Sequence, residues 1–175
     1  MKKLLLFILT IAAFKTATGQ SRNNGDIKSF FFSGGFELGV PSNSPFSISY
    51  GGSGKAEVRV ARTLGVTLTG GYNVYNYKGS FLNFSGQSTN LHPAFIPLKA
   101  GLKYFVGPGF YSEGELGTAL KANYGSGNMF AYAIGFGFEA PLNTYSDIDI
   151  GFRYEGYSQN QYQVTGIRVA YRVGW

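Results

Sequence analysis

Apolar and polar residues alternate along most of the chain, and the pattern is clearest at its C-terminal end. Ile167, Val169, Tyr171, Val173 and Trp175 fall on one side of an extended chain there, while arginine, glycine and alanine fall on the other. A repeat of two residues is the period of a β-strand. This end of the chain is therefore predicted to be a strand with one apolar and one polar face.

The same alternation occurs in eight segments. The predicted strands are residues 29–40, 46–61, 65–77, 94–106, 110–123, 129–140, 147–157 and 162–175. Each is at least as long as the roughly nine to eleven residues that a tilted strand needs to cross a bilayer. Glycine, proline, asparagine and serine lie between them and favour turns, and only residues 78–93 form a long connection. Eight strands with mostly short links predict an antiparallel meander.

Charged residues of the predicted strands share one face, and the other face carries only uncharged, mainly apolar residues. The charged face is predicted to hold Glu37, Lys55, Glu57, Arg59, Lys99, Lys103, Glu113, Glu115, Lys121, Glu139, Asp149, Arg153, Glu155, Arg168 and Arg172. Glycine is also about twice as frequent on that face as on the apolar one. Small residues mark the more crowded side of a curved sheet, which in a barrel is the inside.

The charged face is therefore predicted to point inward. An eight-stranded barrel leaves only enough room for side chains to fill its centre, and each Lys or Arg facing mid-bilayer lipid would cost about 2–4 kcal/mol. The predicted fold is an all-β, eight-stranded antiparallel up-and-down transmembrane barrel. Its inward set of eight basic and seven acidic residues is nearly balanced, which favours an ion-paired plug over an ion-selective pore.

The start of the chain has the features of an export signal. Lys2 and Lys3 precede an apolar run of residues 4–14, and small residues end the segment near residue 19. We expect residues 1–19 to be a signal peptide, 20–28 a periplasmic lead and 29–175 the barrel. Removing Lys2, Lys3 and Lys15 lowers the net charge from +6 to +3, and the chain contains no cysteine.

Composition and motifs give little support to catalysis. Charged residues make up only 14% of the chain and aromatic residues 17%, which is unusual for a soluble surface. One histidine and no cysteine make a transition-metal site improbable, and no cofactor is expected. Basic residues interleaved with acidic ones do not favour nucleic acid. The glycine-rich stretch at 51–56 lacks the residues of a phosphate loop and lies within a predicted strand.

Two features of the sequence leave other functions open. His92 could pair with Ser85 or Ser88 in a lipid-modifying enzyme, although no spacing supports such a pair and a loop histidine is the simpler interpretation. The long connection carries Phe81, Leu82 and Phe84 in a polar segment, which suits packing at the membrane rim or recognition of a partner.

The chain resembles the outer-membrane protein β-barrel domain family, which includes small OmpA-like and OmpX-like barrels. The resemblance rests on residues 93–105 before a Gly-Pro-Gly turn, on residues 151–156 and on the terminal Tyr-Arg-Val-Gly-Trp. It implies a location in the cell outer membrane, contact with its lipids and lipopolysaccharide, and both termini in the periplasm. It also implies insertion by the outer-membrane assembly machinery, which reads a terminal signal that here is Ile167, Val169, Tyr171, Val173 and Trp175. A monomer is expected.

The sequence thus predicts a non-enzymatic, porin-like outer-membrane barrel with a structural, surface-interaction or minor permeability role. Two alternatives stay open at this stage. One is a soluble lipocalin-like ligand-binding barrel with the two faces reversed, because alternation alone does not say which face is outside. The other is the lipid-modifying enzyme based on His92.

Overall fold

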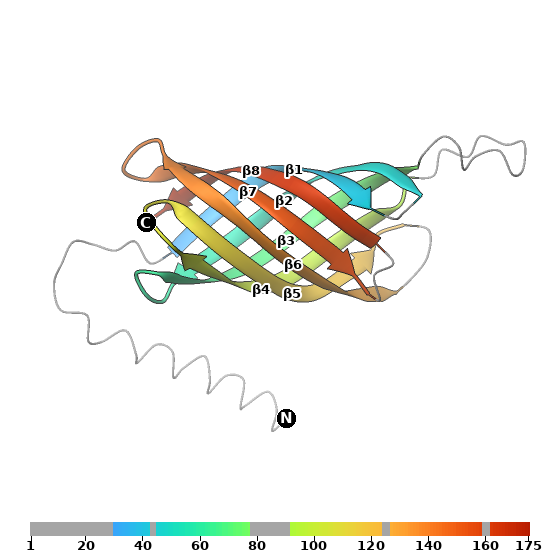
Figure 1. The fold of residues 1–175 in the computed structure, drawn as a ribbon, viewed down its shortest axis with the longest axis horizontal. Coiled ribbons are helices and arrows are strands. Elements are labelled where there is room, and N and C mark those ends of the chain that lie inside the picture. The colour runs from blue at the N-terminus through green and yellow to red at the C-terminus, as the bar shows by residue number, and fades with distance from the viewer. Residues whose placement is uncertain (1–29, 43–44, 78–91, 124–126, 159–161) are drawn as a thin grey trace, which may run out of the picture.

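The computed structural model describes residues 30–42, 45–77, 92–123, 127–158 and 162–175, and these form eight strands (Figure 1). The strands are β1 (Phe30–Ser42), β2 (Phe46–Arg59), β3 (Leu64–Tyr77), β4 (Ala94–Phe105), β5 (Phe110–Lys121), β6 (Asn128–Pro141), β7 (Ser146–Tyr157) and β8 (Tyr162–Gly174). None of the described residues forms a helix long and apolar enough to cross a membrane. The predicted signal peptide and periplasmic lead lie outside the described residues and stay predictions.

The strands form one closed antiparallel barrel. Each strand pairs with the next in the sequence, and β1 pairs with β8 to complete the ring. Closure leaves no sheet edge, so the ladders can satisfy the backbone within the wall. The predicted fold class is confirmed, and the observed strand ends differ from the predicted ones by at most two residues.

The two ends of the barrel differ in their connections. At one end, which we call the turn end, residues 60–63, 106–109 and 142–145 join neighbouring strands. The C-terminus lies at this end (Figure 1). Gly109 has a φ of 77° there, a left-handed conformation that glycine adopts without strain. The other four connections, including residues 78–93, leave from the opposite end, which we call the loop end.

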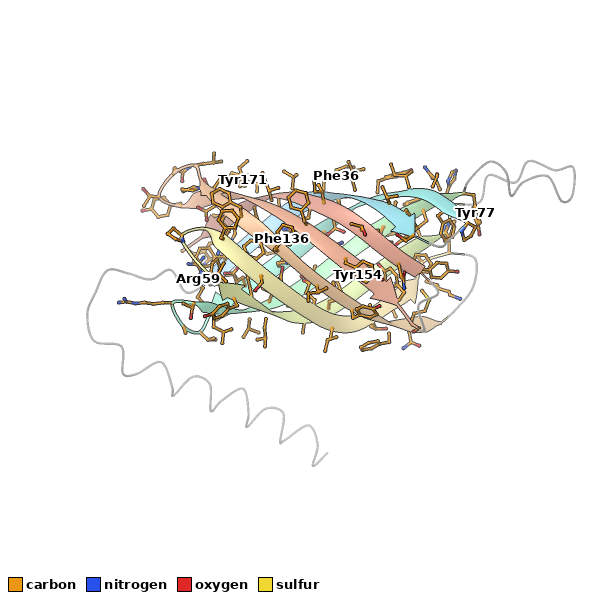
Figure 2. The ribbon with its side chains drawn as sticks, in the orientation of Figure 1. Phe36, Arg59, Tyr77, Phe136, Tyr154 and Tyr171 are labelled. Atoms are coloured by element: carbon orange, nitrogen blue, oxygen red, sulfur yellow. The ribbon has the colours of Figure 1, made fainter. Side chains whose placement is uncertain are left out.

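Large apolar side chains cover the outside of the barrel. Phe36, Phe136 and Tyr171 point away from the axis (Figure 2), and 61% of the Phe136 surface is exposed. No charged residue occupies an outward-facing position of the eight described strands. The interpretation as a lipocalin-like barrel is wrong, because that fold would turn its apolar face inward.

Glycine residues on the inner face lie where the wall is most crowded. A Cβ atom built on Gly101 would lie 2.7 Å from the carbonyl oxygen of Gly114 and 2.8 Å from Thr67 Oγ1. The outward Gly34 and Gly114, by contrast, have no atom within 4 Å of such a Cβ. Inward glycines therefore make the space that the long interior side chains occupy.

Candidate functional site

From mid-barrel to the turn end, the interior is filled by one connected set of charged side chains, which we call the ion-pair network. Every member lies within 4.0 Å of an opposite charge, and the pairs link all of them into a single group. Its members are Glu37, Lys55, Glu57, Arg59, Lys99, Lys103, Glu113, Glu115, Glu139, Asp147, Asp149, Arg153, Glu155, Arg168 and Arg172. All eight strands contribute except β3.

The structure brings together all the predicted charged residues except Lys121. This lysine is the last residue of β5, at the loop end, and it is exposed. It makes no ion pair with a described residue, so its predicted place in the network is wrong. The alternating pattern predicts which face of a strand carries a residue. It does not predict where along the strand the enclosed interior ends.

Asp147 is a member that the sequence analysis missed. Its Oδ2 atom lies 2.7 Å from Arg172 Nη1. The alternating pattern could have placed Asp147 on the inner face, because this residue lies two residues before Asp149 on the same face of β7.

Each basic side chain of the network contacts at least two carboxylates. Lys103 Nζ lies 2.6 Å from Glu139 Oε1, 3.3 Å from Glu57 Oε2 and 3.6 Å from Asp149 Oδ2, and its side chain is fully buried. Lys99 Nζ lies 3.0 Å from Glu115 Oε2 and is equally buried. Charges buried this deeply are tolerated only when they are paired, and here the pairing is multiple.

Hydroxyl groups complete the coordination of the network at mid-barrel. Thr67 donates to Glu113 Oε1 at 2.9 Å, and Thr69 donates to Glu115 Oε1 at 2.6 Å. These threonines are how β3, which lacks a charged interior residue, takes part. Additional hydrogen bonds of this kind offset the desolvation of a buried carboxylate.

Cations pack on aromatic rings at the turn end of the interior. The guanidinium carbon of Arg172 lies 3.5 Å from the ring centroid of Phe31, and that of Arg59 lies 4.2 Å from the centroid of Phe105. Lys103 Nζ lies 3.8 Å above the ring of Tyr111. Figure 2 shows Arg59 near this end of the barrel. The network is therefore covered here by cation–π contacts.

Aromatic rings fill the interior at the loop end, and we call them the aromatic cluster. The members are Phe46, Tyr75, Phe95 and Tyr157, with Tyr77 and Tyr162 partly buried against them. Tyr75 and Phe95 meet edge to face with centroids 5.2 Å apart, and Phe46 lies 4.6 Å from Tyr77. Tyr77 is seen at this end in Figure 2.

The sequence analysis did not predict the aromatic cluster. It placed the charged face of the strands inward and the mainly apolar face outward, yet aromatic rings are buried inside the barrel at both ends. Phe46 is also on the face opposite to the one that simple alternation assigns. A register shift between Phe46 and Ile48 turns the Phe46 ring inward while Ile48 stays exposed.

Small cavities border the interior side chains, and two of them share a lining residue. One borders Lys55 and Glu113, the other borders Glu37 and Asn73, and Arg153 lines both. Each has a volume of about 20 Å³, which holds about one water molecule. Arg153 is held at this position by ion pairs with Glu37 and Glu155.

Of the residues considered for a lipid-modifying enzyme, the structure describes only His92. His92 is exposed, and its Nδ1 lies 2.8 Å from Asn76 Oδ1. Its suggested partners Ser85 and Ser88 lie outside the described residues, as do Phe81, Leu82 and Phe84 of the long connection. Within the part of the chain that the structure describes, no group of three metal-ligating side chains is placed to hold an ion.

The residues of the predicted assembly signal line the outer wall of β8. Val169, Tyr171 and Trp175 are exposed, and Ile167 and Val173 are half-buried on the same side. The Trp175 ring lies 5.2 Å from that of Phe30, and the Trp175 amide donates to the Phe30 carbonyl at 3.2 Å. The chain end is thus fastened to β1, where the barrel closes.

Comparison with known proteins places this architecture among solved structures. The attachment invasion locus protein Ail of Yersinia pestis superposes with a TM-score of 0.57 over 85% of this chain and all of Ail, at 14% sequence identity. The fold is that of the small eight-stranded outer-membrane barrels. This confirms the fold implied by the resemblance to OmpA-like and OmpX-like barrels.

Two further structures agree with that assignment. Neisserial surface protein A gives a TM-score of 0.52 at 18% identity, over 83% of this chain and 97% of that one. The outer-membrane protein AlkL gives 0.56 at 11% identity, over 89% and 94%. No family model matches the sequence, and no curated protein matches it.

Proposed function

We propose that this protein is a non-enzymatic integral protein of the bacterial outer membrane, whose barrel is closed to ion flow by its own side chains. Its role is structural or lies in contacts made at the loop end. The observation that carries the proposal is a charge-free apolar outer wall around an interior whose buried charged side chains are all ion-paired.

The dimensions of the wall suit a bilayer. Strands of 12 to 14 residues measure about 40–45 Å along the chain and, tilted by about 40°, span about 30–35 Å along the barrel axis. The hydrocarbon layer is about 25 Å thick in membranes that hold such barrels. Exposed rings such as Phe36 and Phe136 are stabilised by lipid in this setting and would favour aggregation in water.

The interior supports closure rather than conduction. Seven basic and eight acidic side chains pair with one another in the ion-pair network, so every charge of the network already has an opposite charge beside it, which does not favour passage of a mobile ion. The aromatic cluster fills the loop end, where Phe46 and Tyr157 are almost completely buried. A dissolved ion would have to displace both layers to cross.

Membrane insertion is tested by electrophoresis and extraction. The refolded full chain is expected to migrate differently before and after boiling, and to stay with membranes in a carbonate wash. Unchanged mobility together with release by carbonate would contradict the proposal.

Closure is tested separately in planar bilayers. Wild-type protein is expected to give no discrete conductance steps under conditions where a porin standard does. Regular, ion-selective conductance steps would show that the barrel is a pore and would contradict its closure. They would not contradict its location in the membrane.

The terminal strand is expected to direct assembly through its apolar outer residues. Deleting Trp175 should reduce the amount of protein assembled in the outer membrane more than Phe84→Ala, because Trp175 fastens β8 to β1 where the barrel closes. Quantitative blotting of outer-membrane fractions measures both variants. Equal assembled amounts would contradict the role of Trp175.

A further inference from the structure

The β3–β4 ladder is interrupted in its interior. Its register is continuous, yet Gly71 opposite Pro97 and Tyr72 opposite Ile96 are unpaired. Among the described residues, the other ladders run without an interior gap, apart from the register shift beside Phe46 at one end of β2. The interruption is therefore particular to this seam of the wall.

Proline explains the gap. In an antiparallel pair every second pair of facing residues exchanges hydrogen bonds. The Tyr75 amide donates to the Pro93 carbonyl at 2.9 Å, so these two residues face each other at a hydrogen-bonding position. Gly71 and Pro97 lie four residues further along their strands in the same register, and they therefore also face each other at a hydrogen-bonding position. Pro97 has no N–H, so the Gly71 carbonyl receives no bond from it.

The gap lies at the boundary between the two interior regions. Phe95 of the aromatic cluster lies two residues before Pro97, and Lys99 of the ion-pair network lies two residues after it, with all three facing inward. Tyr72 faces outward and is half exposed. Lipid offers no donor that could replace the missing bond, so this part of the wall is held less firmly than its neighbours.

We propose that the β3–β4 seam opens locally at Gly71 and Pro97 while the rest of the barrel stays closed. The two strands are joined by residues 78–93, the longest connection between neighbouring strands in the sequence. Opening at this height exposes the boundary between the aromatic cluster and the ion-pair network to the membrane. The inference concerns the wall and does not depend on whether the interior conducts ions.

Amide hydrogen exchange on the full chain in lipid nanodiscs tests the proposal. The amides of Asn73 and Phe95, which flank the gap, are compared with those of Gly151 and Arg168, which face each other across the uninterrupted β7–β8 ladder on the opposite side. We expect exchange at the β3–β4 seam to be about tenfold faster, in line with one missing hydrogen bond. Local opening also predicts only a weak dependence on added denaturant.

Pro97→Ala restores the missing donor and serves as the decisive variant. Exchange at Asn73 and Phe95 should slow about three- to tenfold, while exchange at Gly151 stays unchanged. Pro41→Ala is the matched control, because Pro41 lies near the end of β1 and interrupts no ladder.

Three results would overturn the proposal. They are equal exchange at the two seams of the wild type, no response to Pro97→Ala, and uniform slowing of all amides, which would indicate global stabilisation. If Pro97→Ala does not refold, the comparison of the two wild-type seams decides alone.

Discussion

The interior of the barrel is filled with side chains at both ends, but the side chains at the two ends differ in chemical character. At the loop end, Phe46, Tyr75 and Phe95 fill the barrel with rings. From mid-barrel to the turn end, the ion-pair network fills it with charges whose partners come from strands far apart in the sequence, as in the Lys55–Glu113 pair. A narrow barrel can therefore be filled by either kind of side chain. We expect substitutions in the aromatic cluster and in the ion-pair network to change stability for different reasons.

The largest effect is expected from removing the most connected cation. Lys103→Ala should lower the free energy of unfolding by about 4 kcal/mol, because Glu57, Glu139 and Asp149 would all lose a buried partner. Urea titration of the protein refolded in lipid vesicles measures it. Lys103→Met, which keeps most of the volume without the charge, should be nearly as destabilised. Lys121→Ala is the control and should stay within about 0.5 kcal/mol of wild type.

The aromatic cluster should instead respond to volume. Phe95→Ala should lower the free energy of unfolding by about 3 kcal/mol, because the ring is 5% exposed and contacts Tyr75. Phe95→Leu should recover part of that loss in the same titration. If Phe95→Leu were as harmful as Phe95→Ala while Lys103→Met were well tolerated, the contrast between the two regions would be wrong.

A glycine pair on neighbouring strands separates the inside of the wall from the outside. Gly101→Ala should lower the free energy of unfolding by about 2 kcal/mol, because its Cβ would lie 2.7 Å from the Gly114 carbonyl oxygen. Gly114→Ala faces lipid with open space around it and should be close to neutral. Thermal unfolding monitored by the mobility shift on gels ranks the two variants. A larger loss of stability in Gly114→Ala than in Gly101→Ala would contradict the assigned orientation of the two faces.

The smallest effect is expected at the rim of the ion-pair network. Asp147→Asn should change the free energy of unfolding by less than about 1 kcal/mol, because Asp147 is 22% exposed and Arg172 keeps Glu57 at 3.0 Å and Glu139 at 3.2 Å. A loss as large as that of Lys103→Ala would show that the pairs do not substitute for one another.

The periodic features of the barrel could be predicted from the sequence. Alternation places Arg168 and Val169 on opposite faces, and the absence of charge on one face decides which side meets lipid. These properties are local and repeat every two residues, so a single chain displays them directly. The match between predicted and observed strands follows from the same repeat.

Other features depend on events that interrupt the repeat or on distances across the interior. The register shift beside Phe46 reverses one residue's face, and the end of the barrel leaves Lys121 in solvent although its phase is correct. Ion-pair partners such as Arg153 and Glu37 are separated by 116 residues. Arg153 and Glu37 meet only because the barrel closes and because the register of its strands places them at the same level.

The duplicated partners within the interior have an evolutionary consequence. Since no cation relies on a single carboxylate, a lineage can exchange one acidic residue at a time and still pass through folded intermediates. A barrel built in this way can change many of its residues while keeping its shape.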